Sequence, residues 1–218
     1  MPYRRFVTLC LVGAPLLFLV AQVLHPKEYT RNHELQQLAK IGDSYTRWQV
    51  VHFLTFISIA GFVFAVIGLA WLLMRRRPRQ AALGGALGLF GLVSISGVLA
   101  LDGFTWGVLG EVSTFPSADQ HTMQVTLHAV QQSHWNLPFY VGSLAWLIGL
   151  VILSAGLVRE GLIPALPGWI FAAGAVLVGI EAAIENNVYF VVAAVVLAVG
   201  SAGVGNAIGR LDDRELAV

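Results

Sequence analysis

The sequence predicts an all-α membrane protein, a polytopic bundle of six transmembrane helices whose two termini both lie in the cytoplasm. Hydrophobic residues make up 57% of its 218 residues and charged residues 11%, whereas soluble domains average about 45–50% and about 25%. Six apolar runs approach the roughly 20 residues that cross a bilayer. We therefore expect one transmembrane domain over residues 1–218, with spans at residues 6–24, 48–74, 81–103, 136–157, 163–184 and 188–209.

The first run, residues 6–24, follows Arg4 and Arg5 and has about the length of a full span. The apolar core of a signal peptide is about 7–15 residues long and ends at a small-residue cleavage site, which this run lacks in clear form. We expect it to remain as the first helix. The second run, 48–74, is longer than a bilayer requires, so it is expected to tilt or to project from the lipid.

The connections between the runs indicate the orientation. Nine of the thirteen basic residues fall on one side of the predicted bundle, and the Lys/Arg-rich side of a membrane protein is cytoplasmic. An even number of crossings then places both termini inside the cell, in a multi-pass protein of the cell membrane. The nine residues are Arg4, Arg5, Arg75, Arg76, Arg77, Arg79, Arg159, Arg210 and Arg214.

The opposite side is acidic and rich in histidine. Two outer loops, residues 25–47 and 104–135, hold most of its polar residues, and His25, His33 and His121 are expected within these loops. A short helix is expected near residues 32–41. A second helix is expected to start at Ser117, because Ser117 with Gln120 three residues later matches a capping box.

Glycines recur at close intervals in two of the runs, as in Gly84-Gly85, Gly88, Gly91 and Gly97 of the third and Gly200, Gly203 and Gly205 of the sixth. Small residues at such spacing let transmembrane helices approach closely. We interpret these ladders as packing surfaces.

Ionisable residues gather at the outer ends of several runs. At 1.5 Å per residue, His52 lies about 6 Å below the outer boundary, Asp102 at that boundary and Glu181 just inside it. Glu181 and Glu185 are four residues apart and so share a helix face, as do Trp48 and His52. A carboxyl group inside a bilayer costs about 2.5–3.5 kcal/mol at mid-depth, which marks Glu181 as a candidate functional residue.

This arrangement favours acid–base catalysis on an apolar substrate, an isoprenoid or another lipid, in a pocket that opens outward. The candidate proton-transfer residues are Glu181, Asp102, Glu185 and His52. Aromatic faces stabilise carbocations, so protonation-initiated cyclisation or isomerisation fits the pattern, and no cofactor is required. The candidate lining residues are Trp48, Trp106, Trp135, His134, Phe139, Tyr140 and Tyr189.

Two other functions remain open at this point. His52 with His128 or His134 would offer axial ligands to a haem, and histidine with Glu181 and Asp102 would offer ligands to zinc or iron. A non-enzymatic subunit or a small transporter is the other alternative, although a transporter is expected to carry polar residues near the bilayer midplane. The net charge of +1 gives no indication of nucleic-acid binding.

Several residues carry a resemblance to a known group. His25-Pro26 ends the first run, Tyr45-Thr46-Arg47-Trp48 and His52 open the second, and an Arg-rich turn follows. In this the chain resembles uncharacterised bacterial six-helix integral membrane proteins, which implies the topology and no activity. Its acids and aromatic residues also resemble, in general character, those of the small integral-membrane terpene cyclases.

Overall fold

The computed structural model describes residues 2–26, 34–131, 136–184 and 187–211, and within these ranges every regular element is an α-helix. The predicted all-α fold class is therefore confirmed. Five of the helices, α1, α3, α4, α6 and α8, are long and apolar enough to cross a membrane, so this is a multi-pass membrane protein. The helices are α1 (Pro2–Leu24), α2 (Glu34–Asp43), α3 (Tyr45–Met74), α4 (Pro78–Ser113), α5 (Gln120–Gln131), α6 (Asn136–Arg159), α7 (Ala165–Ile184) and α8 (Asn187–Arg210).

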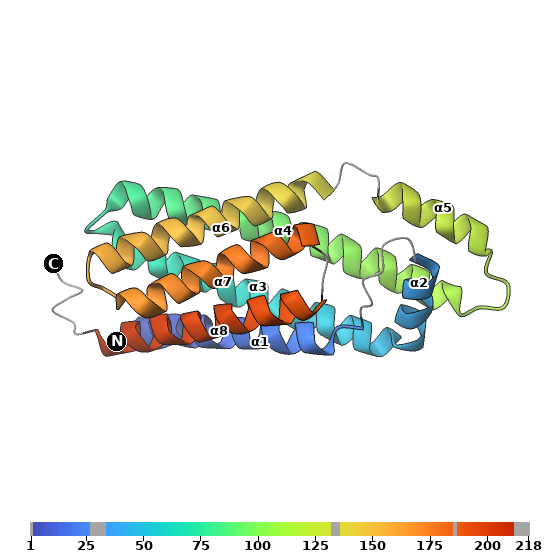
Figure 1. Ribbon diagram of the computed structural model, residues 1–218, viewed down its shortest axis with the longest axis horizontal. Coiled ribbons are helices and arrows are strands. Elements are labelled where there is room, and N and C mark those ends of the chain that lie inside the picture. The colour runs from blue at the N-terminus through green and yellow to red at the C-terminus, as the bar shows by residue number, and fades with distance from the viewer. Residues whose placement is uncertain (1, 27–33, 132–135, 185–186, 212–218) are drawn as a thin grey trace.

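The long helices form a closed ring. Going around it, α1 packs on α3, α3 on α4, α4 on α6, α6 on α7, α7 on α8, and α8 returns to α1. The start of α1, the end of α8 and the α3–α4 and α6–α7 turns lie at one end of the bundle (Figure 1). We call this the basic end, because it carries the arginine-rich turn 75–79, and the opposite one the far end.

Two turns meet at the basic end. Arg76 donates a hydrogen bond from Nη1 to the Glu160 carbonyl oxygen at 3.0 Å, and Arg77 forms an ion pair with the Glu160 carboxylate. The turn between α3 and α4 is thereby tied to the turn between α6 and α7. Among the described residues, arginines of the α3–α4 turn thus contact the α6–α7 turn directly.

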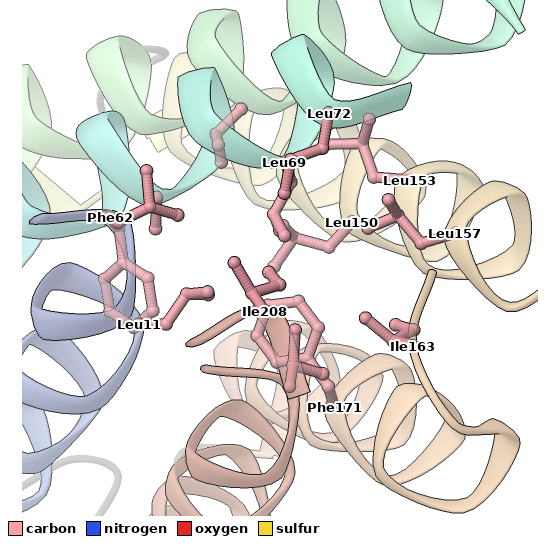
Figure 2. Close-up of a cluster of buried hydrophobic side chains, with 14 of the residues drawn as sticks. Leu11, Phe62, Leu69, Leu72, Leu150, Leu153, Leu157, Ile163, Phe171 and Ile208 are labelled. Carbon is pink, nitrogen blue, oxygen red and sulfur yellow. The ribbon is translucent and has the colours of Figure 1, made fainter. Parts of the chain in front are cut away.

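An aliphatic core fills the half of the ring nearer the basic end (Figure 2). The side chains of Leu69, Leu150, Leu153 and Phe171, from three helices, are at most 1% exposed. Leu11 and Ile208 close the same cluster from α1 and α8. These interlocking side chains hold the six long helices together by close van der Waals packing, which is the main source of helix association in lipid.

Glycines allow the closest helix contacts in this half, as the ladders predicted. A Cβ atom at Gly200 would lie 2.3 Å from the backbone nitrogen of Phe171, and one at Gly149 would lie 2.5 Å from the backbone nitrogen of Gly88. No side chain fits at such distances. Gly97 differs, because a Cβ atom there would meet nothing within 4 Å.

Polar side chains inside the bundle bond to carbonyl groups of neighbouring helices. Pro15 lies within α1 and lacks the N–H that would bond the Leu11 carbonyl one turn earlier. The Ser201 hydroxyl of α8 donates to that Leu11 oxygen instead. Ser58 of α3 donates to the Ala14 oxygen at 2.8 Å. Lipid offers no hydrogen bonds, so these contacts satisfy groups that would otherwise destabilise α1.

A smaller second core lies at the far end, where α4 continues to Ser113, past the predicted end of the third span at residue 103. The side chains of Leu38 on α2 and of Met123 and Leu127 on α5 are buried against one another. We call α2, α5 and the end of α4 the far-end cap. The cap reaches beyond the far ends of α6, α7 and α8 (Figure 1).

The expected start of the helix at Ser117 is wrong, because α5 begins at Gln120 and Asp119 caps it. The Asp119 carboxylate accepts hydrogen bonds from the His121 backbone N–H at 3.1 Å and from the Thr122 hydroxyl at 2.5 Å. These bonds, with the Thr122 hydroxyl contributing most, lower the pKa of Asp119. The two oxygens of a carboxylate can each accept a hydrogen bond at a helix start, whereas a serine side chain has one oxygen.

Candidate functional site

A cluster of aromatic and imidazole rings lies where α1 ends, α3 begins and α4 passes by. It consists of His25, which directly follows α1, with Trp48 and His52 of α3, and it rests against Gly103 of α4. We call it the His–Trp cluster. The predicted pairing of Trp48 with His52 on one helix face is present, with their ring centroids 4.3 Å apart.

Trp48 is the fixed centre of the cluster. Its side chain is 3% exposed, and its indole Nε1–H donates a hydrogen bond to the Gly103 carbonyl oxygen at 2.8 Å. A Cβ atom on Gly107, one turn along α4, would approach Trp48 Cδ1 to 3.1 Å. The Cδ1–Nε1 edge of the indole therefore contacts α4 at Gly107, and the hydrogen bond fixes its position along that helix.

His52 is held in one orientation by its own helix. Its Nδ1 lies 2.9 Å from the Trp48 carbonyl oxygen. A carbonyl oxygen only accepts hydrogen bonds, so Nδ1 carries the proton, and in the neutral ring Nε2 carries the lone pair. A Cβ atom at position 103 would lie 2.5 Å from His52 Cδ2 and 3.3 Å from Nε2. The basic edge of the imidazole thus faces α4 at Gly103.

His25 completes the cluster, and sequence reasoning missed it. Its ring centroid lies 5.0 Å from that of Trp48 and 5.2 Å from that of His52. The adjacent backbone is held by Arg47, whose Nε donates to the Leu24 oxygen, and by Gln37, whose Nε2 donates to the Pro26 oxygen at 3.3 Å. The residue does lie outside a helix, as expected, but the chain folds it back onto α3.

The predicted acids fall mostly outside the described side chains. Asp102 belongs to α4, directly before Gly103, and Glu181 belongs to α7, but neither side chain is described. Glu185, His134 and Trp135 lie outside the described residues altogether. Their roles remain predictions. The position of Asp102 in the chain, next to the glycine that contacts both Trp48 and His52, is consistent with the site that the sequence suggested.

The other predicted lining residues that the structure describes belong to three helices, α4, α6 and α8. Trp106 packs, partly buried, against the second core of the far-end cap. Phe139 and Tyr140 open α6 with their ring centroids 6.0 Å apart, and Tyr140 is 48% exposed. Tyr189 lies half-buried near the start of α8. As substrate-contacting residues these four remain predictions, and they belong to different helices of the far end.

Packing becomes looser from the basic end towards the cluster. Among the described side chains of residues 93–106 on α4 and 176–180 on α7, none is fully buried. Phe18, Leu99 and Val178 contact the aliphatic core but stay only partly buried. Along these two stretches of α4 and α7 the side chains are therefore only partly buried, whereas Val51 of α3, Trp146 of α6 and Ala194 of α8 are buried in the same half.

The His–Trp cluster offers two imidazoles and an indole. Across all the residues that the structure describes, no group of three His, Cys, Asp or Glu is placed to hold a metal ion. An imidazole with a fixed Nδ1–H and a basic Nε2 can accept a proton and return it. The indole face beside it can stabilise positive charge. This chemistry suits proton transfer to and from an apolar molecule.

The fold and the cluster define a class: a multi-pass, all-α membrane protein with a histidine–tryptophan cluster at one end of its helix ring. Residues 7–208, from the first helix to the last, match the model of a family described as a domain of unknown function, DUF4386, and the chain belongs to that family. The match confirms the uncharacterised family that the resemblance implied. Searches of the curated proteins and of the solved structures gave no match.

Proposed function

We propose that this protein is a membrane-embedded acid–base enzyme that acts on an apolar substrate, an isoprenoid or another lipid. The observation that carries the proposal is His52, whose imidazole is held as the Nδ1–H tautomer beside Trp48 and His25 with its basic edge towards α4. The partly buried apolar side chains near the cluster, such as Leu99 of α4 and Val178 of α7, would contact such a substrate.

The proposed topology has six crossings with both termini in the cytoplasm of the cell. The sixth crossing is α7, whose 20 residues span about 30 Å, the thickness of the hydrocarbon core. It packs between α6 and α8 in the ring. The gathering of arginines at the basic end supports a cytoplasmic position for that end. The His–Trp cluster would then lie near the outer surface of the membrane.

The proposed reaction moves protons and needs no other reactant. A carboxyl group, Glu181 or Asp102, donates its proton to a carbon–carbon double bond, whose electron pair forms the new C–H bond and leaves a carbocation. The Trp48 indole face stabilises that cation. His52 Nε2 then removes a proton from a neighbouring carbon, and the C–H electron pair forms the double bond of the product. Return of this proton to the carboxylate restores the enzyme.

The test uses solvent deuterium, because the proposed reaction places a solvent-derived proton on carbon. The full-length protein in liposomes made from total bacterial lipid is incubated in deuterated buffer, and apolar lipids are analysed by mass spectrometry for carbon-bound deuterium. We expect one lipid class to gain deuterium with the wild-type protein. No gain in any lipid above protein-free liposomes would contradict the proposal.

Variants assign the roles. His52→Gln keeps a donor for the Trp48 carbonyl but removes the basic ring nitrogen, so it should abolish deuterium uptake. Of Glu181→Gln and Asp102→Asn, the variant that removes the donor carboxyl should abolish uptake as well. The matched control is His128→Gln, on the exposed face of α5, which should retain uptake. If uptake persists in His52→Gln, this residue is not the base. A visible haem spectrum or stoichiometric metal in the purified protein would support the cofactor-binding alternative instead.

A further inference from the structure

One face of α4 is apolar and uncovered along nearly its whole length. Nine exposed residues recur at an average interval of about 3.6, so they fall on an arc about 100° wide. We call this face the α4 stripe. Its members are Leu83, Ala86, Phe90, Val93, Gly97, Leu101, Phe104, Val108 and Val112.

The α4 stripe is longer than a bilayer can cover. From Leu83 to Val112 it rises about 44 Å at 1.5 Å per residue, against a hydrocarbon core of about 30 Å. Lipid would cover it only at a tilt of about 47°, beyond the 0–40° of transmembrane helices. With its start at the basic end in the membrane, its other end projects into the headgroups or water. Phe104, in that part, is 72% exposed.

Gly97 lies near the middle of the α4 stripe and makes no contact that requires a glycine. The other glycines of α4 would place a Cβ atom 3.3 Å or less from another helix, whereas a Cβ atom at Gly97 would meet nothing within 4 Å. A glycine inside a helix costs about 1 kcal/mol relative to alanine. Its use on an open helix face is to admit the backbone of another helix.

We propose that the α4 stripe is the interface of a homodimer, in which α4 of one chain crosses α4 of a second copy at Gly97. Copies in a membrane share one orientation, so a twofold axis along the membrane normal brings both stripes to the same height. The second copy therefore supplies an apolar helix that projects as far from the lipid as this one does. Glu111, exposed at the margin of the stripe, stays in contact with solvent.

Charge disfavours the membrane surface as the cover for the projecting part. Helices that lie on a membrane use Lys and Arg to bind anionic headgroups. The sequence contains neither residue between Arg79 and Arg159. The end of α4 and the adjoining α5 therefore carry no Lys or Arg with which to hold headgroups, and Lys40 belongs to α2, which packs against Gly110 on the opposite face of α4. A matching apolar helix needs no cation.

Disulfide trapping in native membranes tests the dimer. In a full-length Cys10→Ser background, Val93→Cys and Leu101→Cys each place a thiol on the stripe four residues, about 6 Å, from Gly97. Under copper phenanthroline oxidation we expect both to give a species of twice the 23.5 kDa chain mass, because helices that cross at a glycine bring such positions within disulfide reach. The matched control is Val199→Cys on α8, which is 57% exposed against 56% for Leu101.

A second variant tests the crossing point. Gly97→Leu, added to Leu101→Cys, should reduce the trapped dimer to the level of the Val199→Cys control. Ala173→Leu, at an exposed small residue of α7, should leave it unchanged. Equal trapping at Val199 and Leu101, no trapping at the stripe, or trapping of a different protein there would each overturn the homodimer. These results are independent of whether the protein is an enzyme.

Discussion

The two halves of the helix ring are built for different purposes. At the basic end, leucines and Phe171 interlock without accessible surface, and the Ser201 hydroxyl bonds the carbonyl that Pro15 leaves open. At the far end, residues 93–106 of α4 and 176–180 of α7 include no fully buried described side chain, and the buried Trp48 indole contacts the His25 and His52 rings. The basic half supplies stability, whereas the far half holds a polar aromatic group in a fixed geometry. Variants in the two halves should therefore separate stability from activity.

The largest loss of stability is expected at the basic end. Phe171→Ala removes a side chain that is 1% exposed and leaves a cavity, so it should lower the free energy of unfolding by about 3 kcal/mol or more. The measurement is an SDS titration in mixed micelles. The control is Phe56→Ala, on a 58% exposed side chain of α3. Equal losses in both variants would contradict a solid core in this half.

A smaller loss is expected from Ser201→Ala, because it leaves the Leu11 carbonyl without a partner in lipid. The cost should be about 1–2 kcal/mol of unfolding free energy. In a Pro15→Ala background, the restored N–H at residue 15 bonds the Leu11 oxygen. There the same serine substitution should cost clearly less. If a double-mutant cycle gives identical costs in both backgrounds, the account of this bond is wrong.

At the far end, we expect a substitution to reduce activity more than it reduces stability. Trp48→Phe removes the hydrogen bond to the Gly103 oxygen and shrinks a buried side chain but keeps an aromatic ring, so it should lower the free energy of unfolding by about 1–2 kcal/mol, less than Phe171→Ala. The deuterium uptake proposed above should fall about tenfold or more, because the position of a reacting group controls its rate. Phe56→Ala serves again as the control, with uptake intact. Full activity in Trp48→Phe would remove the indole from the site.

The smallest effect concerns pH and the far-end cap. Hydrogen bonds in the folded protein lower the pKa of Asp119 from its ordinary value of 3.8. The contribution to the stability of α5 is therefore complete above pH 3.8 and is lost as the pH falls from there through the lower folded pKa. The protection of the amides at the start of α5 against hydrogen exchange, relative to their intrinsic rates at each pH, should fall over that interval. Asp119→Ala should exchange faster already at neutral pH, and unchanged exchange would contradict the cap.

Sequence periodicity sufficed for the long helices but not for the far end. The apolar runs, the glycine ladders and the four-residue spacing of Trp48 and His52 follow from helix geometry alone. The approach of His25 to Trp48 does not, because it depends on a chain reversal between α1 and α3 that Gln37 and Arg47 stabilise. Local patterns cannot indicate such a contact.

The extension of α4 to Ser113 was missed for a related reason. Gly103, Gly107 and Gly110 weaken the helix signal and suggest a loop after residue 103, since glycine is a poor helix former. In the fold these glycines contact His52, Trp48 and Ile41. Contacts with α2 and α3 thus override the local preference. His52 and Trp48 lie more than 50 residues before the glycines that they contact. Local sequence patterns cannot predict contacts over such a separation.

The proposed function requires that His52 exchange protons with the solution at the far end of the bundle. The direct measurement is nitrogen NMR of ¹⁵N-histidine-labelled protein in oriented liposomes, assigned with His52→Gln. When the His52 imidazole is uncharged, we expect the ¹⁵N signals of the Nδ1–H tautomer. These signals should change with the pH on the far-end side of the membrane and not with the pH on the basic-end side. An Nε2–H tautomer, no titration, or titration from the basic-end side would contradict the proposed function.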